Sequence, residues 1–167
     1  MRRIMISLAM LVAAAPRFAM AEAAVAAQPS AALFDNAATA AVDVEIALAQ
    51  AAVNGKRVIV VMGANWCHDS TGLAGWFETP RFQAMLREKY EIVYVDVGTP
   101  QTGKGRNLEI AKRFGIKKVK STPLVLVLSS NGERLNSKQD ASRWRNAASR
   151  SENAIFDYFK DFAAGQK

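Results

Sequence analysis

The sequence predicts an α/β protein with a mixed central sheet flanked by helices. Residues 58–61 form an uninterrupted β-branched run, which is typical of a strand covered on both faces. Helical and strand patterns alternate from that run onward, and strand-helix-strand units require parallel pairing. A second apolar run at 124–128 precedes the turn residues Ser130-Asn131-Gly132, which predicts an antiparallel hairpin at the edge of the sheet.

Length and composition limit the classes of protein to which the chain can belong. It has 167 residues, of which 50% are hydrophobic, and a single cysteine. An intrinsically disordered chain has far fewer aliphatic residues, and a disulfide framework needs at least two thiols. Both classes are excluded, and one globular domain is expected.

The N-terminal segment predicts export. Residues 1–21 combine a basic start, an apolar core and an Ala19-Met20-Ala21 cleavage site, as a signal peptide does. The apolar core is shorter than the roughly 20 residues that span a membrane. We therefore expect a signal peptide at 1–21, a flexible leader at 22–32, one domain at 33–167, and a periplasmic or secreted protein without a stable membrane span. Cleavage leaves 19 basic and 15 acidic residues, an excess too small to indicate nucleic acid.

Periodicity places the elements in the order α-β-α-β-α-β-β-α. A first helix with an apolar face of Val42, Ile46, Ala49 and Val53 ends at Asn54-Gly55. The helical stretch after residue 70 is divided at Thr79-Pro80, because proline restricts the residue before it. The remaining predictions are strands at 58–61, 91–97, 124–128 and 133–136, a loop at 98–106, and helices at 107–114 and 140–163.

Cys67 is the first candidate for chemistry. It follows a predicted central strand directly and stands at the first turn of a helix. Unpaired N–H groups and the helix dipole favour an anion there, and the thiolate is the nucleophilic form of cysteine. Cys67 is therefore a candidate nucleophile, and the alternative is a buried, inert thiol.

The residues around Cys67 resemble a known active site. The run Trp66-Cys67-His68-Asp69-Ser70, between strand and helix, together with Thr122-Pro123 before a later strand, resembles the W-C-x-x-C site and cis-proline of the thioredoxin superfamily. The element order is similar over about residues 40–162. The helix divided at Thr79-Pro80 most resembles the periplasmic thioredoxin-like branch.

The resemblance implies a thioredoxin-like fold and a role for each matching residue. Cys67 would be the attacking cysteine, Trp66 would pack beside it, and Pro123 would be the cis-proline facing the sulfur. Thr122 would offer backbone groups to a bound peptide strand. Trp66, Thr122 and Pro123 are thus expected to bind substrate.

Three departures from the family pattern change the expected chemistry. Ser70 replaces the resolving cysteine, so an intramolecular disulfide cannot form. Val61 stands where the family has a buried acid. His68 and Asp69 fill the two central positions, where a protonated His68 would favour the thiolate and Asp69 would oppose it.

The expected function is therefore monothiol thiol-disulfide exchange. Cys67 would attack a protein or glutathione mixed disulfide, assisted by Ser70 and His68, and an external thiol would resolve the product. We expect thiol- or disulfide-containing protein partners and no cofactor, with glutathione or another thiol as a possible co-substrate. Two alternatives stay open, namely a non-catalytic binding or chaperone-like module and a homodimer linked through Cys67.

Other signals are weaker. Between Lys104 and Lys120 lie seven basic residues and one acid, Glu109. The segment could attract acidic substrates or glutathione, although a solvated basic face is the commoner explanation. Aromatic residues do not interleave with these charges, so nucleic acid is not expected. No metal site is expected either, because Cys67, His68 and Asp69 lack a further histidine or cysteine to complete a ligand set.

Overall fold

A three-stranded sheet of β2 (Tyr90–Asp96), β1 (Arg57–Gly63) and β5 (Leu124–Leu128), in that order, forms the centre of the computed structural model. The structure describes residues 33–35 and 38–165. The short strands β3 (Gly98–Thr99) and β4 (Lys104–Gly105) pair in a second sheet. The helices are α1 (Ala40–Asn54), α2 (His68–Phe77), α3 (Pro80–Lys89), α4 (Leu108–Arg113), α5 (Lys138–Ser142) and α6 (Glu152–Ala163), with 3-10 turns η1 (Pro100–Thr102) and η2 (Ala147–Ser149).

The central sheet is mixed, as predicted. β1 pairs in parallel with β2 and antiparallel with β5, so that Val60 lies opposite Val93 on one side and Leu126 on the other. The β-branched run that predicted this strand is fully buried. Its central place explains why both of its faces are apolar.

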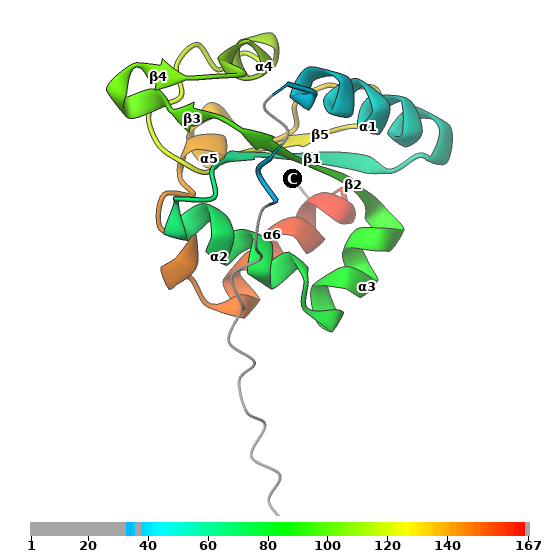
Figure 1. The fold of residues 1–167 in the computed structure, drawn as a ribbon. Helices are drawn as coiled ribbons and strands as arrows, with labels where there is room; N and C mark the ends of the chain where they lie inside the picture. Colours follow the sequence, from blue (N-terminus) through cyan, green and yellow to red (C-terminus); the bar gives the residue numbers. More distant parts are fainter. Residues whose placement is uncertain (1–32, 36–37, 166–167) are drawn as a thin grey trace, which may run out of the picture.

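Helices cover both faces of this sheet (Figure 1). Alternate residues of β1 point to opposite sides. Val58, Val60 and Met62 join the core beneath α1 and α4, whereas Ile59 and Val61 join the core formed with α2, α3 and α6. Thr79 and Pro80 divide α2 from α3 where the sequence predicts it, with Thr79 in an extended conformation and Pro80 in the first turn of α3.

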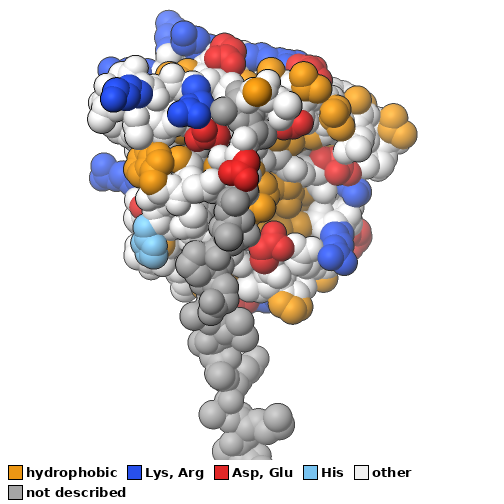
Figure 2. Space-filling view, viewed as in Figure 1, with side chains coloured by type: hydrophobic (Ala, Val, Ile, Leu, Met, Phe, Trp, Pro, Cys, Tyr) orange, Lys and Arg blue, Asp and Glu red, His pale blue; other side chains and the backbone are white. Residues whose placement is uncertain are grey.

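The predicted apolar face of α1 is wrong. The helix ends at Gly55 in the left-handed conformation, as expected, but its buried residues are Ala40, Val44, Ala47 and Ala51. Val53 is 90% exposed, and Val42 and Ile46 are exposed too. Apolar side chains therefore appear on the outer surface along α1 (Figure 2). Small residues let the helix lie close to the sheet, so the alanine-rich face, and not the larger valines and isoleucine, packs inward.

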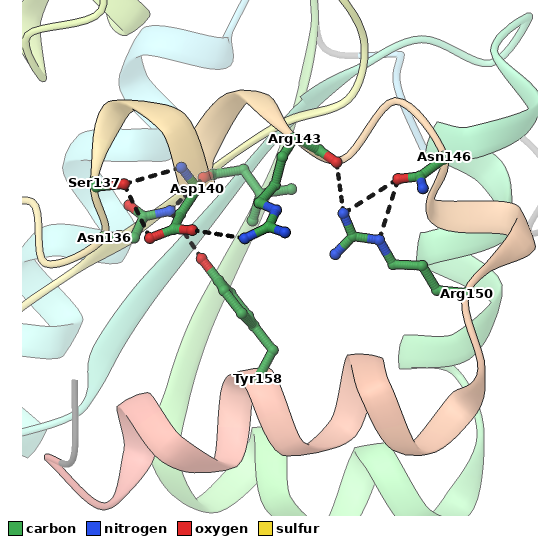
Figure 3. A network of polar contacts seen from close by, with 8 residues as sticks. Asn136, Ser137, Asp140, Arg143, Asn146, Arg150 and Tyr158 are labelled. Carbon is green, nitrogen blue, oxygen red and sulfur yellow. Dashed lines mark hydrogen bonds and ion pairs between the residues drawn. The ribbon is translucent and has the colours of Figure 1, made fainter.

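The predicted strand at 133–136 is reduced to a single bridge between Leu128 and Arg134. Beyond this bridge, the side chain of Asn136 makes the hydrogen bonds to the edge of β5. Its side-chain oxygen accepts the Val127 N–H at 3.1 Å, and its amide nitrogen donates to Val125 O at 2.8 Å. Asn136 also bonds Tyr158 and lies at one end of the polar network in Figure 3. Backbone bonds from Ser129 N–H to Glu133 O and from Leu135 N–H to Val127 O start the hairpin, and the Asn136 side chain continues the pairing along β5.

The predicted single helix at 140–163 is also wrong, because the structure has α5, η2 and α6 in its place. Ser137 and Ser151 begin α5 and α6 as N-caps, with Ser137 Oγ accepting the Asp140 N–H and Ser151 Oγ the Ala154 N–H. The break lets the Trp144 ring stack on Phe159 in the core, with 5.4 Å between ring centroids. The two serine caps and the packing of Trp144 therefore favour two short helices over the single helix that the apolar pattern predicts.

The predicted signal peptide and leader lie outside the described residues. No helix in the described part of the chain is long and apolar enough to cross a membrane.

Candidate functional site

Cys67 lies where β1 leads into α2. β1 ends at Gly63, and the Cys67 N–H then donates to Ala64 O at 3.0 Å, which turns the chain. Cys67 is the N-cap of α2 in an extended conformation, and its carbonyl accepts the Thr71 N–H. Its side chain therefore stands at the positive end of a ten-residue helix.

The Cys67 sulfur lies beside the carbonyl of Thr122, the residue before Pro123. The Thr122-Pro123 peptide bond is cis, as the family resemblance implies. Cys67 Sγ donates to Thr122 O over 3.6 Å, across 55 positions of sequence. Cys67 is 8% exposed and Thr122 is 5% exposed, so the thiol is nearly buried beside the cis-proline loop.

Ser70 lies in the same turn of α2 but is fully buried. Its Oγ makes no hydrogen bond with any residue that the structure describes, the Cys67 sulfur included. A Cβ built on Gly63 would lie 2.6 Å from this hydroxyl, so the lack of a side chain at Gly63 makes the room for Ser70. Ser70 is therefore adjacent to the thiol without being bonded to it.

His68 and Asp69 point to different environments. His68 is exposed in the first turn of α2. Asp69 Oδ1 accepts the Ala148 N–H at 3.0 Å and so ties the start of α2 to η2. Sequence reasoning treats Asp69 only as a charge beside the thiol, because its partner lies 79 positions away.

Trp66 joins the site to the β3–β4 hairpin. Its ring is 57% exposed, and its indole N–H donates to Gly98 O at 3.1 Å. Gly98 has a φ of 59°, and a Cβ there would meet Lys104 O at 2.6 Å. The segment 98–106, which the sequence predicts only as a loop, is thus a glycine-dependent hairpin that holds Trp66.

Basic side chains gather over this end of the molecule, above β3, β4 and α4 (Figure 2).

The described residues contain no group of three or more His, Cys, Asp or Glu side chains placed to hold a metal ion.

Comparisons with known proteins agree with this geometry. The profile of a family described as thioredoxin-like matches residues 37–130. The chain belongs to the thioredoxin-like family. That match includes Cys67, Ser70 and the cis-proline Pro123.

A solved structure resembles this thioredoxin-like chain closely. It is a disulphide isomerase from Xylella fastidiosa Temecula1, with 29% sequence identity and a TM-score of 0.69. The similarity covers 80% of this chain and 98% of the isomerase. A search of curated proteins returned no significant match.

This thioredoxin-like chain has the fold and the cis-proline of its family around a single thiol. The residue six positions before Cys67 is Val61, which is fully buried between β2 and β5. No described side chain offers Cys67 a second thiol, because the sequence has one cysteine. A disulfide of Cys67 therefore needs a thiol from another molecule.

Proposed function

We propose that the protein catalyses thiol-disulfide exchange through Cys67 alone, on protein or glutathione mixed disulfides in the cell envelope. The observation that carries the proposal is the Cys67 sulfur at the start of α2, opposite the cis-proline loop. The similarity to a disulphide isomerase supports the same class of reaction. Cell-envelope location rests on the predicted signal peptide.

The proposed reaction has two exchange steps. The Cys67 thiolate attacks one sulfur of a substrate disulfide, a Cys67–substrate disulfide forms, and the other substrate sulfur leaves as a thiolate. An external thiol such as glutathione then attacks the substrate sulfur of the mixed disulfide, forms a new disulfide with that sulfur and releases Cys67 as the thiolate. Each step exchanges one disulfide for another, so the cycle suits reshuffling, or deglutathionylation when Cys67 carries glutathione and the product is oxidised glutathione.

Each residue near the thiol has a defined part in this proposal. Thr122 and Pro123 present the backbone edge against which an extended substrate segment lies, and Trp66 offers an exposed ring beside it. His68 is exposed in the first turn of α2, directly after the thiol, and would assist the exchange from there. Ser70 fills the position of the resolving cysteine and leaves the mixed disulfide open to the external thiol.

The first test measures turnover of a glutathionylated peptide with reduced glutathione as the second substrate. We expect the protein to accelerate release of the peptide thiol and Cys67→Ser to abolish the acceleration. Ser70→Cys should gain net reduction of a protein disulfide when a dithiol reductant is supplied, because a second thiol can then resolve the mixed disulfide. Equal rates for the natural protein and Cys67→Ser would contradict the proposal.

A second candidate, a non-catalytic peptide-binding module, is favoured by the small exposure of Cys67. Alkylation by iodoacetamide distinguishes the two functions. The exchange protein should label rapidly in its folded state at neutral pH, whereas a buried inert thiol should label only after denaturation. A non-reducing gel of the same samples detects the homodimer linked through Cys67.

A further inference from the structure

A groove lined by lysines lies beside the loop that ends at the cis-proline. It has a volume of about 430 Å³, and its walls come from the segment 115–120 and from α5. Lys117, Lys118 and Lys120 contribute from the first wall and Lys138 from the second. Ser121 Oγ donates to Ser142 O at 3.4 Å and joins the two walls. We call this feature the lysine groove.

The positive charge of the lysine groove is not neutralised within the described residues. No ion pair there includes any of its four lysines. The nearest acid along α5, Asp140, pairs with Arg143 and accepts from Ser137 Oγ. All four lysine residues are exposed, so their ammonium groups are available to a partner.

A fifth cation lies behind the groove. Gly115 lines one end of it, and a Cβ built on Gly115 would lie 3.9 Å from Nη1 of Arg134. The Nε and Nη1 atoms of Arg134 are buried and make no hydrogen bond with the described residues. Buried cationic nitrogens without a bonded partner add to the positive potential at this end.

One wall of the lysine groove leads along the chain into the candidate site. The carbonyl of Thr122 lies 3.6 Å from the Cys67 sulfur, and Lys120 is two residues before Thr122 in the chain. An extended strand advances about 3.3 Å per residue. A substrate segment that lies along the cis-proline edge therefore reaches the lysines within a few residues of its reacting sulfur.

We propose that the lysine groove binds a carboxylate-rich polypeptide segment next to the disulfide of the substrate protein. Charge complementarity selects Asp and Glu side chains, and the position of Lys120 two residues before Thr122 at the cis-proline edge selects an extended polypeptide. As a statement about substrates, this inference rests on the proposed exchange function. It adds a preference for acidic sequences around the reacting cysteine.

A binding measurement tests the groove independently of the chemistry. The probe is an unstructured, cysteine-free peptide rich in Asp and Glu, compared with the same peptide carrying Asn and Gln. We expect the full-length reduced protein to bind only the acidic peptide, with NMR shifts at 115–121 and 138–142. The triple variant Lys117→Gln, Lys120→Gln, Lys138→Gln should weaken binding about tenfold.

A charge-matched variant serves as the control. Arg87→Gln, Lys89→Gln and Lys160→Gln remove the same charge from α3 and α6, on the other face of the sheet. This control should keep acidic-peptide affinity within about twofold at physiological salt, where surface charges beyond about 8 Å are screened. Equal loss in the two triple variants, or equal binding of the acidic and amide peptides, overturns the proposal.

A kinetic arm separates failure of the groove from failure of the exchange function. Cys67 is reacted with the same two peptides carrying one glutathionylated cysteine, and with an uncharged small disulfide, 2-hydroxyethyl disulfide. We expect the acidic peptide to react about tenfold faster than its amide counterpart at low salt, and the groove variant to lose this ratio while its rate with the uncharged disulfide stays unchanged. Peptide binding without any exchange would contradict the proposed function and leave the groove intact.

A last experiment tests whether the lysine groove binds an anionic membrane surface. Vesicles containing phosphatidylglycerol are mixed with the protein and with the groove variant. We expect no lysine-dependent binding to them, because the proposed ligand is an extended peptide. Lysine-dependent vesicle binding without acidic-peptide binding would overturn the proposal.

Discussion

At the scale of single residues, one amide side chain completes the central sheet. Asn136 is 2% exposed and makes two hydrogen bonds to the edge of β5, one as donor and one as acceptor. A carboxamide can do both at once, as a backbone peptide group does. Ser70 has the opposite character, since its buried hydroxyl has no partner among the described residues. Removal of the Asn136 side chain should therefore lower the free energy of unfolding through lost hydrogen bonds, whereas removal of the Ser70 hydroxyl breaks none.

Asn136→Ala should lower the free energy of unfolding by about 2–4 kcal/mol, because it leaves the Val127 N–H and Val125 carbonyl buried and unpaired. Urea unfolding of the variant measures this loss. Asn131→Ala is the matched control, since Asn131 is exposed in the preceding turn, and it should change stability by less than about 0.5 kcal/mol. Equal effects of the two substitutions would contradict the role given to Asn136.

At the scale of elements, α1 shows how packing selects a face. Its inward face consists of Val44 and three alanines, while Val53 lies on the opposite, solvent-facing side. Apolar residues lie on both sides of the helix, so periodicity alone does not distinguish the buried face. The close approach to β1 and β2 selects the face with the smaller side chains.

The same substitution at two positions of α1 measures this choice of face. Val44→Ala removes two buried methyl groups and should cost about 2 kcal/mol. Val53→Ala should leave stability within about 0.5 kcal/mol of the natural protein, because the residue is exposed and alanine favours helix. Thermal unfolding of both variants provides the comparison, and a greater loss at Val53 would contradict the observed face.

At the scale of the whole molecule, the core between the sheet and α2, α3 and α6 holds all three tyrosines of the chain. Burial raises the pKa of Tyr158 to about 12 and raises the pKa of Tyr90 and Tyr94 above their ordinary value. Tyr90 OH donates to Phe159 O, and Tyr158 OH accepts from the Asn136 amide. The neutral tyrosines are therefore part of the packed interior.

Alkaline pH should destabilise the protein through these tyrosines. An unfolded tyrosine loses its proton near pH 10, whereas the folded groups keep theirs to higher pH. The stability they contribute is present below about pH 10 and is lost as pH rises through about 12. Urea unfolding across this range should show a falling free energy, less steeply in Tyr158→Phe. Tyrosinate absorbance near pH 10 in the folded protein would contradict this expectation.

The sequence by itself determined the features that depend on neighbouring residues. It predicted the α/β class, the central strand, the division at Thr79-Pro80 and the position of Cys67 at a helix start, because each depends on local hydrophobic patterns or backbone restrictions. The resemblance of Trp66–Ser70 and Thr122-Pro123 to a known family added the fold that the comparisons then confirmed.

Only the tertiary structure decided which residues from distant segments meet. It placed the alanine face of α1 inward, gave the edge of β5 to Asn136, tied Asp69 to Ala148, and brought Lys138 to the lysines of the cis-proline loop. These contacts join positions far apart in the chain and depend on close packing and on pairing of buried polar groups. A one-dimensional pattern does not contain that information.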